Sequence, residues 1–217
     1  IGHAPAEMVR AATNGLVDKP WPAQLNRKVW SKRFTEASGE VRPLILSIGQ
    51  VVPHEVMGMA NFNKNVFVGT GGVDAINLSH FIGAVYGMEN MMGRKDNPLR
   101  AILNYASKEF LEKQLDLWYI LTVVAPGADG ELCVRGLYIG NDIECYSQAC
   151  DLSLKVNFTM LEKPVHRMVA YLDPDEFRST WLGNKAIYRT RMAMADGGTL
   201  IVLAPGVHRF GEDDAID

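Results

Sequence analysis

The segment Leu44–Val52 limits the fold of this chain more than any other part of the sequence. It is apolar and rich in β-branched residues, and Pro53-His54 ends it. A continuous run of this kind is typical of a buried strand in a sheet covered on both faces. A second run, Leu117–Val124, leads into turn residues at 128–130, which predict a hairpin. Because helical patterns alternate with these strands, one opening at Asn97-Pro98 and another at Asp142, we predict an α/β fold.

The end of the first predicted strand is where we expect chemistry. In open α/β sheets, functional side chains lie beyond the carboxyl ends of the strands, which is where His54 stands. A loop rich in glycine and asparagine follows at residues 58–72 and holds one cation, Lys64. The helical pattern after this loop, which we expect to run to Gly93, places His80 on one face with apolar and small residues. Three basic or metal-ligating side chains therefore belong to one loop and its flanks.

A second structural unit is predicted toward the end of the chain. It consists of a strand, a helix and a strand, at Val165–Leu172, Pro174–Arg191 and Thr199–Leu203. We place a domain boundary near Glu162, which gives an N-terminal domain at 1–162 and the beginning of a C-terminal α/β domain at 163–217. The chain starts with Ile1 and stops in a polar segment, so we expect both domains to be truncated.

Charge and composition favour a small-molecule partner. The chain has 22 Lys and Arg against 25 Asp and Glu, a formal net charge of −3 at pH 7. With no overall basic field, we predict no nucleic-acid partner. The apolar runs are too short to span a membrane and no leader opens the sequence, so we expect a cytoplasmic protein without a membrane partner. The 3 cysteines do not have the spacing of a zinc site.

Three known motifs come close to matching in the glycine-rich region, and each fails at a decisive position. In the dinucleotide-like loop Gly69–Asp74, an aspartate replaces the third glycine, and its carboxylate would repel a phosphate. In the P-loop-like span Gly58–Lys64, Asn63 replaces the glycine before the lysine. His54-Glu55 lacks the second histidine of a zincin motif. The region therefore matches none of these three motifs.

Taken singly, the three basic residues have ordinary interpretations. His54 would cap a strand end, Lys64 would be solvated, and His80 would be a satisfied histidine on an apolar helix face. Their spacing is what favours function. Lys64 follows His54 by ten residues, and His80 follows Lys64 by sixteen.

At these residues the sequence resembles the nickel-pincer lactate racemase family of 2-hydroxyacid racemases and epimerases. Ser47–His54 is similar to that family's strand and catalytic histidine, and the two intervals match without a gap. Later positions also resemble the family's pattern, namely Asn97-Pro98, Asp129-Gly130, Lys185 and residues 197–202. The likeness covers residues 24–212. It implies two α/β domains, the N-terminal one bearing the cofactor, with the site at their interface.

The resemblance implies a role for each residue of the site. Lys64 would carry a nickel-pincer nucleotide through a thioamide, and His80 would be the protein's nickel ligand, since a neutral imidazole suits that metal. His54 would be one of two bases, taking the substrate's hydroxyl proton while hydride leaves the adjacent carbon for the cofactor. His3 would be the second catalytic histidine, and Lys185 would hold a carboxylate or a cofactor phosphate. The partners would be a lactate-like or sugar-derived 2-hydroxy acid and the cofactor-assembly enzymes.

The sequence also departs from this family. The loop Gly58–Asn63 reads Gly-Met-Ala-Asn-Phe-Asn in place of a Gly-Phe-Ser-Gly-Gly pattern, and Leu182 replaces a family glutamine near Lys185. Because of these changes, the sequence does not determine which 2-hydroxy acid is the substrate. Two other functions remain as alternatives: a non-catalytic protein that binds an anionic sugar acid or nucleotide, and a nicotinamide dehydrogenase, which the failed glycine pattern disfavours.

Overall fold

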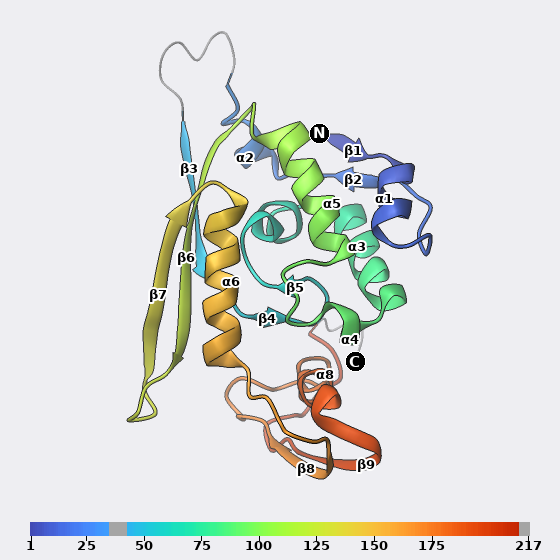
Figure 1. Ribbon diagram of the computed structural model, residues 1–217, viewed down its shortest axis with the longest axis vertical. Coiled ribbons are helices and arrows are strands. Elements are labelled where there is room, and N and C mark those ends of the chain that lie inside the picture. Colours follow the sequence, from blue (N-terminus) through green and yellow to red (C-terminus); the bar gives the residue numbers. More distant parts are fainter. Residues whose placement is uncertain (35–42, 213–217) are drawn as a thin grey trace. The chain divides into compact units, whose positions relative to one another are not determined.

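The computed structural model describes residues 1–34 and 43–212 and divides the chain into two compact units, Ile1–Phe158 and Thr159–Asp217 (Figure 1). Both units contain helices and strands, so the predicted α/β fold is confirmed. The division lies close to Glu162, where the sequence places its boundary. That the units are the two expected domains, with a site at their interface, stays a prediction. No helix in the described ranges is long and apolar enough to cross a membrane.

The first unit contains a three-stranded sheet with the order β3-β6-β7. β3 (Leu44–Gln50) runs parallel to β6 (Asp116–Pro126), and β7 (Leu132–Gly140) runs antiparallel to β6. The predicted turn at 128–130 joins β6 to β7 and includes Gly130 at a φ of 84°. Both apolar runs therefore form strands, as their composition predicts, and the structure shows that the two strands are neighbours.

Helix α6 (Ile143–Asn157) packs against β6 and β7 on one face of this sheet (Figure 1). Ile45, Leu117 and Tyr138 pack on the core on that inner side. Alternate residues such as Ile48 point to the outer face and are exposed. The prediction that the apolar runs are fully buried is therefore wrong for every second side chain, because a strand sends successive residues to opposite faces.

Two helices of the first unit begin at capping residues that the sequence provides. α5 (Pro98–Ala106) follows Asn97, and α6 follows Asp142; each capping side chain accepts a hydrogen bond from a backbone amide of the first turn. A π-helical turn, η3 (Ser107–Leu111), continues α5. These caps fix where each helix begins.

The helix expected to run from the glycine-rich loop to Gly93 is divided in two. α3 (Val73–Tyr86) ends at Gly87, which has a φ of 93°, and α4 (Met88–Met91) follows. Glycine takes such a positive φ without strain, so it ends a helix and redirects the chain.

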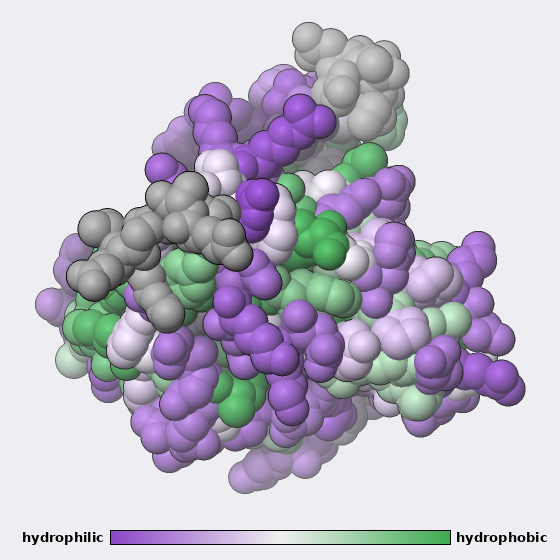
Figure 2. Space-filling view, turned by 90° about the horizontal axis from the view of Figure 1, so that it is seen from above, coloured by the Kyte–Doolittle hydropathy of each residue, from purple (hydrophilic) through white to green (hydrophobic). Residues whose placement is uncertain are grey.

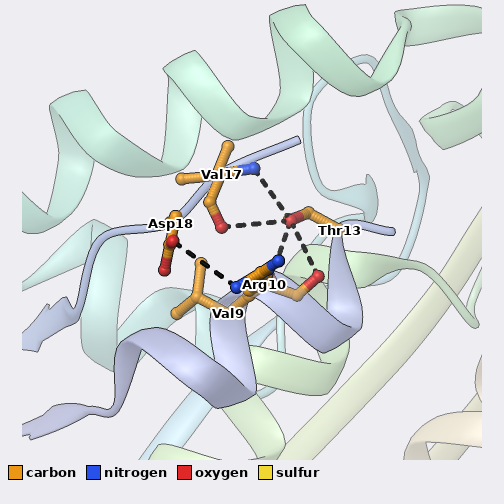
Figure 3. A network of polar contacts seen from close by, with 5 residues as sticks. All are labelled: Val9, Arg10, Thr13, Val17 and Asp18. Carbon is orange, nitrogen blue, oxygen red and sulfur yellow. Dashed lines mark hydrogen bonds and ion pairs between the residues drawn. The ribbon is translucent and has the colours of Figure 1, made fainter. Parts of the chain in front are cut away.

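The segment before the sheet ties the N-terminus to the same core. Its elements are β1 (Gly2–Ala4), α1 (Ala6–Ala12), β2 (Trp21–Ala23) and α2 (Arg27–Trp30), with β1 and β2 antiparallel. The buried Thr13 hydroxyl ends α1, because it donates to the Val9 carbonyl oxygen at 2.8 Å and accepts from the Val17 amide at 3.1 Å (Figure 3). An exposed Arg10–Asp18 ion pair of 3.8 Å spans the same turn (Figure 3).

The second unit has a two-stranded parallel sheet of β8 (Val165–Tyr171) and β9 (Met194–Leu203). The single helix predicted at 174–191 is wrong. Three shorter pieces replace it: α7 (Thr180–Gly183), α8 (Lys185–Thr190) and the 3-10 turn η4 (Arg191–Ala193). Asp173 and Ser179 each accept a hydrogen bond from a backbone amide a few residues on, which favours turns and delays the helix start.

Candidate functional site

His54 lies just beyond β3, on the short strand β4 (Pro53–His54), which pairs with β5 (Gly58–Met59). Its Nδ1 accepts hydrogen bonds from the backbone amides of Val56 and Met57, both at 3.1 Å. A ring nitrogen that accepts a hydrogen bond has no proton, so the neutral ring carries its proton on Nε2. The turn that follows His54 therefore fixes its tautomer.

His80 has the opposite tautomer. It is exposed on α3, and its Nδ1 lies 2.8 Å from the Ile76 carbonyl oxygen one helical turn earlier. Because a carbonyl oxygen only accepts, Nδ1 is the donor and the lone pair of the neutral ring is on Nε2. Histidines that bind metals commonly hold their other nitrogen in this way.

The turn that fixes the tautomer of His54 packs directly on α3, the helix that carries His80. A Cβ atom added to Gly83 would lie 2.8 Å from Val56 Cγ1, so this close approach requires glycine. Gly83 lies three residues after His80, and residues at that spacing are neighbours on a helix surface. The His54 turn and the His80 helix are thus in contact.

Lys64 lies on the loop between them. It is half-buried and stands directly before the π-helical turn η2 (Asn65–Gly69). Single π turns are rare and occur frequently at functional sites. Just before the lysine, Asn61 and Phe62 have φ values of 67° and 60°. Two consecutive non-glycine residues in this left-handed region cost energy, so the surrounding structure must hold them.

The side chain that holds this strained loop is Arg100 on α5. It is 2% exposed, and its guanidinium donates to the Met59 carbonyl oxygen at 2.8 Å and to the Asn63 side chain. It also donates to the Asn61 carbonyl oxygen at 3.5 Å. The guanidinium carbon lies 4.4 Å from the centre of the Tyr146 ring, which adds a cation–π contact.

The sequence reasoning missed Arg100. It is one of the buried residues of α5, together with Leu99, Ile102 and Leu103. An arginine within an apolar helical pattern needs buried acceptors, and that is the signal that could have identified it. The acceptors themselves come from a loop far away in the sequence, so the pattern alone does not name them.

Aromatic rings also pack against the strained loop. Phe62 stacks on Tyr146 with ring centres 5.0 Å apart and lies 4.3 Å from the Tyr119 ring. The Tyr146 hydroxyl donates to the Met59 carbonyl oxygen at 3.3 Å. Burial raises the pKa of Tyr146 above its usual value, and the nearby Arg100 charge only partly opposes this. The hydroxyl therefore remains a donor to the loop at neutral pH.

A cavity of about 610 Å³ borders the same loop but lies at the other end of the sheet. Phe62, Asn63 and Asn104 line it together with Asp116, the first residue of β6. Because β3 and β6 are parallel, Asp116 marks the amino end of the pair, whereas His54 follows the carboxyl end. In open α/β sheets the carboxyl end is where reactions take place, so we take the His54 region as the candidate active site.

Two predicted site residues lie on other elements. His3 is exposed on β1, which packs against β2 and α5. Lys185 begins α8 in the second unit. Their roles stay predictions based on the resemblance. In residues 1–34 and 43–212, no three His, Cys, Asp or Glu side chains gather as a metal site.

The comparisons with known proteins support a fold and no more. No protein-family model and no curated protein matches the sequence. A crystal structure of a Thermotoga maritima protein is similar at a TM-score of 0.81 and 27% identity, over 99% of this chain and 50% of that one. The lactate racemase apoprotein from Thermoanaerobacterium thermosaccharolyticum is similar at a TM-score of 0.60 and 18% identity, over 75% of this chain and 37% of that one. The chain thus has an α/β fold like that of a lactate racemase and spans about half the length of the first match.

Gly83→Ala is expected to disturb the contact between α3 and the His54 turn. Alanine in a helix is intrinsically favourable by up to about 1 kcal/mol, but overpacking against Val56 costs about 1–3 kcal/mol. We therefore expect a net loss of about 1 kcal/mol in denaturant unfolding. Asn77→Ala, on an exposed position of the same helix, is the control and should be neutral or slightly stabilising. Equal stability of the two variants would contradict the contact.

Proposed function

We propose that this chain is the cofactor-bearing part of a racemase or epimerase that inverts a 2-hydroxy acid. One observation carries the proposal: the His54 turn contacts the His80 helix, with Lys64 on the loop that joins them, in a chain whose fold is like that of the lactate racemase apoprotein. The order and spacing of the three residues are those of the family that the sequence resembles.

The residues present fit the nickel-pincer nucleotide implied by that family. His80 offers a neutral Nε2 lone pair at an exposed position, and imidazole nitrogen is a suitable ligand for divalent nickel. Lys64 would carry the nucleotide, which supplies a reversible acceptor for the substrate's hydride when it is bound. The remaining nickel ligands would come from that group. Lys185 would bind a carboxylate or phosphate through its ammonium group.

His54 would contact the oxygen at the inverted carbon. In the tautomer fixed by the Val56 and Met57 amides, Nε2–H donates a hydrogen bond to a substrate oxygen. To take the hydroxyl proton at Nε2, the ring must first carry its own proton on Nδ1, and the two amide hydrogen bonds must open. The turn at 55–57 would therefore move when His54 changes from donor to base, and His3 would act as the second base.

The test follows the hydrogen on the inverted carbon. Protein made together with the cofactor-assembly enzymes is expected to racemise an enantiopure 2-hydroxy acid in D2O without placing deuterium on C2, because hydride does not exchange with solvent. Chiral chromatography measures inversion and mass spectrometry measures deuterium. His80→Ala should lose nickel and activity, whereas Asn77→Ala should keep both. Deuterium on C2 would indicate proton abstraction and would contradict the hydride mechanism.

The competing role as a non-catalytic binding protein gives a different result. Thermal stabilisation by an anionic sugar acid or nucleotide would then persist in the double variant His54→Ala/His80→Ala. The racemase proposal expects no inversion in that variant. Wild-type protein that carries the cofactor yet inverts none of a panel of 2-hydroxy acids would favour the binding role.

A further inference from the structure

The outer face of the β3-β6-β7 sheet is apolar along all three strands. The register places Leu46 beside Trp118, and Ile48 beside Ile120, which in turn pairs with Ile139. Leu46 is 51% exposed, Ile48 66% and Ile139 58%. The polar side chains Gln50 and Thr122, which pair with each other, lie on the same face near the carboxyl end of β3.

This face is the extended apolar surface of the first unit; the two-stranded β8-β9 sheet of the second unit exposes a smaller one at Val169, Tyr171, Ile201 and Leu203. Hydrophobic residues reach the surface among hydrophilic ones in the view from above (Figure 2). Scattered exposure of that kind is normal, because folded proteins lack the polar surface to cover themselves. A contiguous apolar patch that extends over neighbouring strands is instead typical of a surface that another segment covers.

The strand pairing indicates what kind of segment that is. β3 and β6 are parallel, and all-parallel sheets occur almost only where both faces are covered, although here β7 adds an antiparallel strand at one edge. The inner face already has α6 (Figure 1). Because the outer face carries apolar side chains on all three strands, it fits amphipathic helices with an apolar stripe. The Asp116 carboxylate lies on this face at the amino end of β6, where it accepts a hydrogen bond from Trp118 Nε1 at 3.0 Å.

The occupant we infer is the same polypeptide. The chain matches the Thermotoga maritima protein over 99% of its own length but over only 50% of that protein's length. We propose that helices corresponding to the unmatched half of that protein cover the outer face of β3, β6 and β7. A second copy of this chain is the rival occupant. The proposal does not depend on the racemase function.

The test compares two lengths of the polypeptide, the 217 residues and the complete reading frame to which they belong. The paired substitution Ile48→Gln/Ile139→Gln is made in both. In the 217-residue chain it should leave the melting temperature unchanged and lower the fluorescence of bound ANS by at least about twofold, because the side chains are exposed there. In the longer chain the same substitution should lower the melting temperature by about 5 °C or more, since it buries amides.

Leu16→Gln is the matched control, because Leu16 is exposed outside the sheet, in the turn after α1. It should leave the melting temperature unchanged at both lengths. Circular dichroism checks that each variant folds. Wild-type protein of the longer length should bind little ANS, which tests without any substitution whether the outer face is covered.

Three outcomes would overturn the proposal. The reading frame could end with these 217 residues. The 217-residue chain could be a dimer by light scattering that the paired substitution converts to monomer, which would assign the face to a second copy. The longer chain could tolerate the substitution as well as Leu16→Gln, which would leave the face uncovered.

Discussion

Lys64→Arg is expected to abolish both the mass added to the peptide that carries this residue and all racemisation above the uncatalysed background. The side chain is half-buried at the start of η2, so arginine keeps its charge and much of its packing. A guanidinium remains protonated at neutral pH and is not a nucleophile, so it cannot form the thioamide link that the proposed function requires. The measurements are peptide mass spectrometry and chiral chromatography on protein made with the cofactor-assembly enzymes.

The matched control is Lys28→Arg, at an exposed position on α2. It should keep the added mass and the activity. Thermal melts of both variants should equal that of the wild type, which separates a chemical effect from misfolding. A Lys64→Arg protein that still carries the group, or that still inverts substrate, would show that the cofactor is attached elsewhere. Wild-type protein without added mass would reject the proposed function itself.

Arg100→Met is expected to destabilise the first unit by about 3 kcal/mol. Methionine fills a similar volume but has no hydrogen-bond donor. The Asn63 side-chain oxygen and the Asn61 carbonyl oxygen, both of buried residues, therefore lose the hydrogen bond that Arg100 donates. Each buried acceptor left without a partner costs about 1–3 kcal/mol. The Met59 carbonyl keeps one donor, the Tyr146 hydroxyl, which limits the loss.

Denaturant unfolding measures this loss, and a thermal melt should show a fall of roughly 6–12 °C for a unit of this size. Arg94→Met is the control, because Arg94 is exposed and lies shortly before α5, the helix that carries Arg100. This substitution should change the free energy of unfolding by less than about 0.5 kcal/mol. If Arg100→Met were as stable as Arg94→Met, the strained conformation of Asn61 and Phe62 would not depend on the guanidinium.

Local patterns in the sequence were sufficient for much of the fold. The two apolar runs predicted β3 and β6. The turn residues that follow the second run predicted the hairpin from β6 to β7. Asn97 and Asp142 predicted the starts of two helices. These predictions succeed because strand period, turn type and helix capping depend on residues a few positions apart. The helix at 174–191 failed because turn-forming side chains at its start outweighed the helical pattern.

The sequence also named the three residues of the candidate site, but not their chemical state. The tautomer of His54 comes from its own turn, while the contact between Val56 and Gly83 joins that turn to α3. The buried Arg100 forms its hydrogen bonds with residues some forty positions earlier in the chain. Such pairings depend on how distant segments approach each other, which no local pattern contains.

The sequence by itself thus determined the α/β class, the strands, the capped helices and the order of His54, Lys64 and His80. Only the tertiary structure decided which nitrogen of each imidazole is protonated, which side chain holds the loop before Lys64, and which face of the sheet stays uncovered in these residues. The physical reason is that propensity and periodicity act between neighbours in sequence, whereas hydrogen bonding to buried acceptors and burial of a sheet face are settled by segments that meet only in the folded chain.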